Sequence, residues 1–187
     1  MSKSNKLLLA LGLFVTSSIA WFACHNKTVG GADSSNATAQ ALLAGTKPDT
    51  TVTGTVRFTE RNGKVKMMLQ VSIPLKANQN VAVHIHENGA CGDMGKAAGG
   101  HWNPTMVNHG KWGNGSFHLG DIGNISLDAR GNGRMEMETS LWTITGTGTN
   151  NILNKGIIVH GGTDDYTSQP AGNAGSRIGC GVIEKSN

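Results

Sequence analysis

Apolar and polar residues alternate with a period of two along much of this 187-residue chain, and the alternation predicts β-strands. Residues 52–58 alternate apolar side chains with Thr and Arg, and residues 65–73 repeat the pattern after Asn62-Gly63, a strong signal for a tight hairpin turn. Short strands at close intervals predict an antiparallel all-β sandwich or barrel. Further runs of this kind lie at residues 81–85, 122–127, 134–137, 141–145, 156–160 and 179–183.

Two stretches, residues 88–121 and 161–177, interrupt the alternation and are long, polar and rich in glycine. Loops of that length in a compact domain are usually functional or disordered, so we expect the chemistry of the protein there. The chain holds 27 glycines, about twice the usual share, without the Gly-x-y period of collagen. Only 15% of its residues are charged, which argues against charge-driven disorder.

The first 23 residues differ in composition from the rest of the chain. Lys3 and Lys6 precede an apolar run over residues 7–23, as in a secretory signal. An uncleaved membrane anchor is the alternative, although Thr and Ser interrupt the run and its length is marginal for a span. Removal of the signal leaves 14 basic against 12 acidic residues, a net charge of +2 instead of +4. No Lys/Arg cluster or aromatic platform is present, so no nucleic-acid partner is expected.

Residues 24–50 are rich in Ser, Thr, Ala, Asn and Gly and lack a sustained periodicity. They predict a flexible linker between the signal and a folded domain at residues 51–187. A short helix over residues 39–44 is the alternative within this segment. The signal itself predicts export, to the periplasm or the cell envelope.

The chain contains three cysteines, of which Cys91 and Cys180 lie in the body. An exported chain meets oxidising conditions, so these two are the natural disulfide partners. Cys24 follows the apolar run directly and has two interpretations. It is either acylated and membrane-anchored, as in bacterial lipoproteins, or it follows an ordinary cleaved secretory signal.

Six histidines in the body of the chain lie in or next to the two long loops. They are His84, His86, His101, His109, His118 and His160. His84 and His86 flank one strand residue, so both imidazoles point to the same side and can chelate one metal ion. His160 ends a later strand and can reach this pair across the sheet. A site made only of imidazoles suits copper.

The other histidines suggest a second metal site. His101, His109 and His118 follow at intervals of eight and nine residues, and Asp121 comes three residues later. Three imidazoles and one carboxylate fill the tetrahedral shell of zinc and leave no position for water, which marks a structural site. Six unrelated histidines are the alternative, but the spacing and the loop context favour metal binding.

Several short motifs together resemble the copper/zinc superoxide dismutase family over about residues 51–187. They are His-Ile-His-Glu-Asn-Gly at 84–89, Gly-Gly-His-Trp-Asn-Pro at 99–104, His-Leu-Gly-Asp at 118–121, Gly-Asn-Ala-Gly-Ser-Arg at 172–177 and Cys-Gly-Val-Ile at 180–183. Cys91, five residues after His86, resembles the bacterial, exported branch. The combination is far more specific than any single motif.

The resemblance implies a Greek-key antiparallel barrel of about eight strands with two long functional loops. It implies an oxidoreductase that converts superoxide anion to oxygen and hydrogen peroxide, with a copper ion that changes oxidation state and a structural zinc. The implied ligands are His84, His86, His101 and His160 for copper, and His101, His109, His118 and Asp121 for zinc. His101 would be shared by both metals.

The resemblance also assigns residues around the metals. Asp164 would hydrogen-bond one copper histidine and one zinc histidine, although adjacent Asp165 could compete for this role. Cys91–Cys180 matches the family disulfide. Arg177 would dock superoxide through its permanent charge. The segment at 167–171 is short and lacks the charges that steer substrate in animal relatives, so we expect only a modest dependence of the rate on salt.

Three other functions compete with a dismutase. A metal carrier or interaction domain would not need all ligand positions filled. A zinc hydrolase needs an open zinc position and a general base, which the saturated ligand set argues against. A blue-copper protein needs a cysteine ligand, and no cysteine suited to such a centre lies among these histidines. The sequence is compatible with both a monomer and a homodimer.

Overall fold

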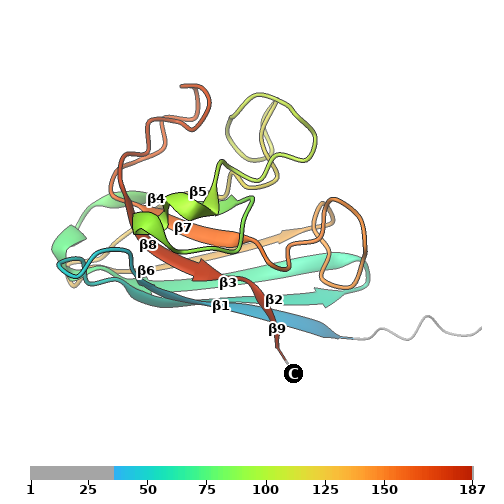
Figure 1. Cartoon of the computed structure of the whole chain (residues 1–187), viewed down its shortest axis with the longest axis horizontal. Coiled ribbons are helices and arrows are strands. Elements are labelled where there is room, and N and C mark those ends of the chain that lie inside the picture. The colour runs from blue at the N-terminus through green and yellow to red at the C-terminus, as the bar shows by residue number, and fades with distance from the viewer. Residues whose placement is uncertain (1–35, 187) are drawn as a thin grey trace, which may run out of the picture. The chain divides into compact units, whose positions relative to one another are not determined.

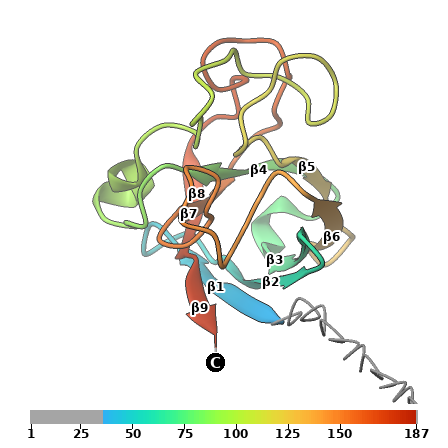
Figure 2. The same cartoon turned by 90° about the vertical axis from the view of Figure 1, so that its right-hand side faces the viewer.

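The structure is a computed structural model that describes residues 36–186. One antiparallel sheet runs in the order β5-β4-β7-β8-β1-β2-β3-β6, and β9 pairs with β1. Its two end strands, β5 and β6, lie side by side, so the sheet nearly closes into a barrel (Figures 1 and 2). The all-β prediction is therefore confirmed.

The strands are short, as the spacing of the sequence runs predicts, and two 3-10 helices that were not predicted lie between them. They are β1 (Ala37–Gly45), β2 (Thr53–Arg61), β3 (Lys64–Ser72), η1 (Pro74–Lys76), β4 (Asn80–His86), η2 (Asp93–Ala98), β5 (Gly123–Ser126), β6 (Asn132–Thr139), β7 (Gly156–His160), β8 (Arg177–Val182) and β9 (Glu184–Ser186).

The β2–β3 hairpin forms at the predicted turn. Asn62 and Gly63 have φ angles of 50° and 72°, the left-handed backbone that a two-residue hairpin turn requires. Arg61 pairs with Lys64, and the ladder continues to the far ends of both strands. The turn therefore sets the register that sends alternate side chains inward.

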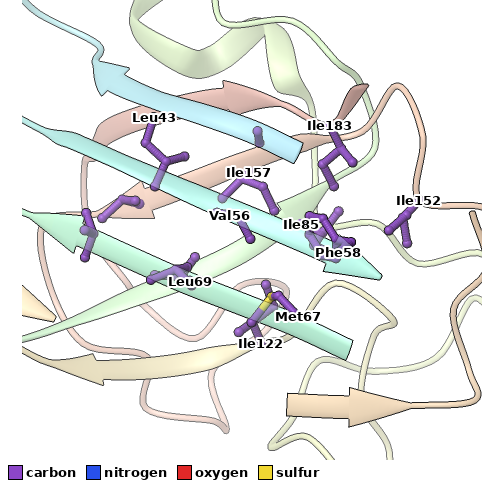
Figure 3. Close-up of a cluster of buried hydrophobic side chains, with 14 of the residues drawn as sticks. Leu43, Val56, Phe58, Met67, Leu69, Ile85, Ile122, Ile152, Ile157 and Ile183 are labelled. Atoms are coloured by element: carbon purple, nitrogen blue, oxygen red, sulfur yellow. The ribbon is translucent and has the colours of Figure 1, made fainter. Parts of the chain in front are cut away.

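The core fills the inside of the barrel with side chains from several strands. Figure 3 shows Val56 and Phe58 of β2 together with Met67 and Leu69 of β3, and all four are at most 1% exposed. Ile85 of β4 lies in the same cluster. Burying apolar area at about 25 cal/mol per Å² makes this cluster the main stabilising element of the fold.

The linker prediction is wrong for residues 37–45, which form β1. This strand pairs with β2 along its length and contacts β8 and β9 at its two ends. Its inward residues are small, Ala37, Ala39 and Ala41 followed by Leu43, so the alternation gives a weak hydropathy signal. The alternative helix at residues 39–44 does not form either, because neighbouring strands satisfy the backbone of β1. The predicted signal at residues 1–23 and Cys24 lie outside the described residues.

The predicted strand at residues 141–145 is also wrong. That segment is bent and irregular, and only Thr143 in it makes an isolated bridge, to Asn151. The short C-terminal β9 was not predicted. Within residues 36–186, no helix has the length and apolar character needed to cross a membrane.

Both long loops leave the same side of the barrel. In Figures 1 and 2 the yellow-green segment before β5 and the red segment before β8 rise together above β4 and β5. Side chains on the outer face of β4 are consequently buried beneath them, as the burial of every residue from Val81 to His86 shows. The outer face of β4 thus forms the rigid base of this region, and the two long loops cover it.

Candidate metal centre

The strand β4 presents two histidines on its outer face. His84 and His86 alternate with Val83 and Ile85, whose side chains point into the core. The imidazoles are at most 1% exposed because the loops cover them. The rigid ladder between β4 and β7 fixes their positions, since His84 pairs with Ile158.

Two further histidines complete a four-imidazole cluster. His160 ends β7 at a register irregularity, and His101 makes an isolated bridge with His86. The ring centroids of His84 and His101 lie 4.0 Å apart, and those of His84 and His160 lie 4.9 Å apart. One ligand atom from each of the four residues falls within 4.8 Å of the others.

A second cluster surrounds the carboxylate of Asp121. Its oxygens lie 2.8 Å from Nδ1 of His101, 3.0 Å from Nδ1 of His109 and 3.2 Å from Nδ1 of His118. Only the contact with His101 has hydrogen-bond geometry. Nδ1 of His109 and Nδ1 of His118 lie close to the carboxylate but make no hydrogen bond to it. The four ligand atoms again lie within 4.8 Å of one another, and His101 belongs to both clusters.

Six buried imidazole nitrogens in these clusters have no hydrogen-bond partner among the described residues. They are Nδ1 of His84, His109 and His118 and Nε2 of His86, His101 and His160. A buried polar atom without a partner costs free energy, so such atoms are rare in native proteins. Their convergence at two points fits the nitrogen-rich donor sets of copper and zinc.

The opposite ring nitrogen of five histidines is held by an acceptor. The carboxylate of Asp164 accepts from Nε2 of His84 at 2.8 Å and from Nε2 of His109 at 2.9 Å, so it joins the two clusters. These bonds fix both tautomers and ring orientations. The three remaining acceptors are the carbonyls of Gly99 for His86, Val107 for His118 and Gly175 for His160.

Asp165 does not compete with Asp164. Its carboxylate is exposed and accepts hydrogen bonds from the backbone of Thr167 and Ser168. Gly172 has a left-handed φ of 64°, and a Cβ there would collide with the Asp164 carboxylate and lie 2.6 Å from Nε2 of His109. The glycine therefore lets the loop backbone close over the bond between Asp164 and His109.

The electrostatics favour the neutral form of three of these imidazoles and the charged form of the Asp121 carboxylate. Burial lowers the pKa of His86 to about 2, that of His160 to about 3 and that of His101 to about 4. Burial alone would raise the pKa of Asp121, but hydrogen bonds, first of all from His101, hold it below its ordinary value. Neutral imidazole and ionised carboxylate are the forms that bind metal.

An open cleft of about 800 Å³ leads to the histidines. Its lining includes His86, His101, His118, His160 and Arg177. The guanidinium of Arg177 donates 2.7 Å and 2.6 Å hydrogen bonds to the carbonyls of Gly95 and Gly99, which hold it at the wall. Burial lowers its pKa, but arginine stays protonated at any working pH.

Three residues near the centre were missed by the sequence reasoning. Lys47 and Lys96 line a hollow next to Arg177, and Gln169 lines the cleft itself. Lys96 lies close to Cys91 in sequence, and this proximity could have suggested that it lies near the metal clusters. Neither Lys47 nor Gln169 stands in a motif, so no local signal pointed to them.

The predicted disulfide between Cys91 and Cys180 is confirmed, with a Cα–Cα distance of 5.7 Å. It ties the loop that contains η2 to the core strand β8 across 89 residues of sequence. For a loop of that length, entropy models give about 4–5 kcal/mol of stabilisation. A structural disulfide is the usual mark of an exported protein.

Comparisons with known proteins agree with this geometry. A family model described as copper/zinc superoxide dismutase (SODC) matches residues 52–183. The chain is 38% identical over 135 residues to copper–zinc superoxide dismutase 1 of Aquifex aeolicus (strain VF5), covering 70% of this chain and 79% of that one. It is 36% identical over 143 residues to an extracellular copper–zinc superoxide dismutase of Caenorhabditis elegans, covering 73% and 63%.

A solved structure shares the fold. The crystal structure of the clock protein EA4 superposes with a TM-score of 0.70 at 28% identity and covers 80% of this chain and 94% of that one. The barrel carries two clusters of metal-binding side chains that have His101 in common, which defines a β-barrel metalloprotein with two adjacent metal sites. The chain belongs to the copper/zinc superoxide dismutase family. It is an oxidoreductase that dismutates superoxide, with copper and zinc as cofactors.

Proposed function

We propose that each cluster holds one of the two metals of the dismutase. His84, His86, His101 and His160 would hold copper through the four ring nitrogens that lack a protein partner. All four donors are imidazoles, the ligand type that copper(II) favours in tetragonal geometry. The cleft opens onto this cluster, which gives a small anion access to it.

The second cluster suits zinc. His101, His109, His118 and Asp121 supply three nitrogens and one oxygen, which fills a tetrahedral shell. Asp121 is fully buried and also accepts hydrogen bonds from the backbone N–H groups of Gly110 and His118. These bonds hold the carboxylate in place, as a structural metal site requires.

Dismutation converts two superoxide ions and two protons to one oxygen molecule and one hydrogen peroxide molecule. When bound, copper supplies the one-electron redox chemistry that zinc lacks. His101 lies between the two clusters with Nε2 in one and Nδ1 in the other, so Nε2 is the atom at which it would take up and return a proton. Its place at the cleft wall brings that proton close to the product peroxide.

Arg177 would dock the substrate anion at the same cleft. Its side chain carries a fixed positive charge, and two backbone carbonyls orient its donor groups. Lys47 and Lys96 line the adjoining hollow and add positive charge beside it. Positive charge around a cleft raises the capture rate of anions.

The observation that carries this proposal is the pair of four-residue clusters that share His101. The test is metal analysis and copper spectroscopy of purified full-length protein, followed by the same measurements on His101→Ala. A shared ligand predicts that this variant disturbs both metals and that wild-type protein removes superoxide while forming one peroxide per two superoxide ions. Disturbance of one metal alone refutes the shared ligand, and copper-loaded wild-type protein without activity refutes the dismutase assignment in favour of a carrier.

We also propose that the protein belongs to the bacterial exported branch, with residues 1–23 as the signal and Cys24 as a lipid-anchored N-terminus in the periplasm or cell envelope. The disulfide supports export, and an extracellular relative shows that members of the family are secreted. Mass spectrometry of the mature N-terminus tests the anchor. A diacylglyceryl mass on Cys24 supports it, whereas an unmodified Cys24 or cleavage elsewhere refutes it.

A further inference from the structure

We infer that Gln169 is a positioning residue for the zinc site because its side-chain amide holds the backbone of His109. The inference rests on the proposed assignment of His109 as a zinc ligand. Nothing in the family motifs points to Gln169, which stands in the charge-poor segment before Gly172. Its function follows from contacts between two loops that are 60 residues apart in sequence.

The amide of Gln169 satisfies both backbone polar groups of His109. Its Oε1 accepts a 2.9 Å hydrogen bond from the N–H of His109, and its Nε2 donates a 3.0 Å hydrogen bond to the carbonyl of the same residue. Neither group of His109 has another hydrogen-bond partner within residues 36–186. One side chain thus replaces the ladder that would fix this residue in a strand.

His109 needs such support because no regular element holds it. It lies in the irregular segment between η2 and β5 and is 3% exposed, so water does not reach its backbone freely. The Asp164 carboxylate fixes its ring through Nε2. Together, Gln169 and Asp164 hold His109 at the N–H, the carbonyl and the ring, which leaves Nδ1 directed at Asp121.

A compact network of hydrogen bonds holds the segment around Gln169, whose Nε2 also donates to the carbonyl of Thr167 at 3.3 Å. Asp165 accepts from the backbone N–H of Ser168, and Asn173 donates from Nδ2 to both Asp165 and Ser168. The N–H of Gly172 donates to the carbonyl of Ser168 at 2.7 Å. The segment that lacks steering charges therefore has a different function. It holds the side-chain amide of Gln169 in position against the irregular segment between η2 and β5, here called the zinc loop.

The expected consequence concerns zinc rather than the barrel. Without the amide, the buried N–H and carbonyl of His109 lose their partners and Nδ1 is no longer held toward the other ligands. Groups that orient a metal ligand typically change metal affinity by about 10- to 100-fold when they are removed. We therefore expect zinc retention to fall at least tenfold while the barrel stays folded.

The test compares Gln169→Met with Thr167→Val in the purified full-length protein. Methionine keeps the length of the side chain but neither hydrogen bond, whereas Thr167→Val removes a bond of the same loop to Asp165 without touching His109. Zinc release to a chelator and the visible spectrum of cobalt(II) in the zinc position are measured for both. Gln169→Met should release zinc at least tenfold faster and change the cobalt bands, and Thr167→Val should match wild type.

A third variant separates positioning from folding. Gln169→Glu keeps an acceptor for the N–H of His109 but sets an oxygen against its carbonyl, so its zinc release should exceed that of wild type. Wild-type zinc release and cobalt bands in both Gln169 variants overturn the inference and leave the zinc assignment standing. Failure of wild-type protein to bind zinc or cobalt overturns the zinc assignment and the inference with it.

Discussion

The indole N–H of Trp142 donates a 2.9 Å hydrogen bond to the carbonyl of Leu119, in the middle of the segment that links two zinc-type ligands. Trp142 is 1% exposed and packs edge-on against Phe58 of β2 and Trp112 of the zinc loop. The zinc loop is thus fastened to the barrel by one buried donor as well as by apolar contacts. Edge-to-face pairs of this kind add about 0.5–1.5 kcal/mol beyond their buried area.

Replacement of Trp142 by phenylalanine should weaken both the fold and zinc binding. Phe keeps an aromatic ring but leaves the buried carbonyl of Leu119 without its donor, which costs about 1–3 kcal/mol. Denaturant unfolding and zinc release to a chelator measure the two effects. Trp112→Phe is the control, since Trp112 is only partly buried and no hydrogen bond of its indole is present within the described residues. An equal loss in both variants contradicts the hydrogen-bond explanation.

Asp164→Asn should weaken both metal sites together. The carboxylate accepts from His84 through one oxygen and from His109 through the other, and an amide would set its NH2 group against one of these N–H groups. We expect the affinities for copper and zinc each to fall by about 10- to 100-fold, measured by competition with chelators of known affinity. Asp49→Asn replaces an exposed carboxylate whose side chain bonds only Thr50 within the described residues, and it should leave both affinities unchanged. Loss at one site alone would show that Asp164 does not couple them.

Arg177→Ala should lower the rate of superoxide removal by about tenfold or more, because steering and docking of anions depend on local positive charge. Arg177→Lys should recover part of the rate, since it restores the charge without the planar fork that bonds Gly95 and Gly99. The rate is measured at two ionic strengths within each variant. An unchanged rate and salt response in Arg177→Ala rules out the docking role.

Neutralising Lys47 and Lys96 together should reduce the salt dependence of the rate without changing metal content. Both side chains line the hollow that Arg177 also lines, and neither residue belongs to the two metal-ligand clusters. The Debye length at physiological salt is about 8 Å, so the charges of these two lysines attract the substrate anion only at short range. The double variant Lys47→Gln/Lys96→Gln is compared with wild type across salt concentrations. A salt response identical to wild type excludes steering by these lysines.

Removal of the disulfide by Cys91→Ser/Cys180→Ser should destabilise the protein by about 2–5 kcal/mol. The bond constrains the unfolded chain and fastens the η2 loop, whose carbonyls hold Arg177. Unfolding by denaturant measures the first effect and the rate of superoxide removal the second. Cys24→Ser is the control because it leaves the pair intact. Equal stability of all three proteins would contradict the structural role of the bond.

The metal-free protein should lose stability as the pH falls from about 6.5 toward 4. In the folded chain the pKa values of His86, His160 and His101 lie at about 2, 3 and 4, below the ordinary value of 6.5. The unfolded chain therefore binds more protons in this range, which costs up to about 1.4 kcal/mol per pH unit for each group. Denaturant unfolding across this range measures the slope. Stability that is flat or rises on acidification contradicts the burial of neutral imidazoles.

The sequence by itself determined the strands with clear alternation, the hairpin at Asn62-Gly63, and the spacing of the histidines, because each depends on local periodicity or turn chemistry. The tertiary structure decided what local patterns do not contain. Ala-rich β1 exists because β2 and β9 pair with it.

The segment at residues 141–145 is bent rather than a strand because of a residue far away in sequence. Glu60 lies at an inward position of β2 and accepts hydrogen bonds from the backbone of Ile144 and Thr145. Burial would raise the pKa of Glu60, but these bonds hold it below its ordinary value, so the carboxylate stays ionised. The bonds withdraw that backbone from any ladder, and only the folded barrel brings the two segments together. The same physical reason hides the amide of Gln169 from sequence analysis, since its partner stands 60 residues earlier.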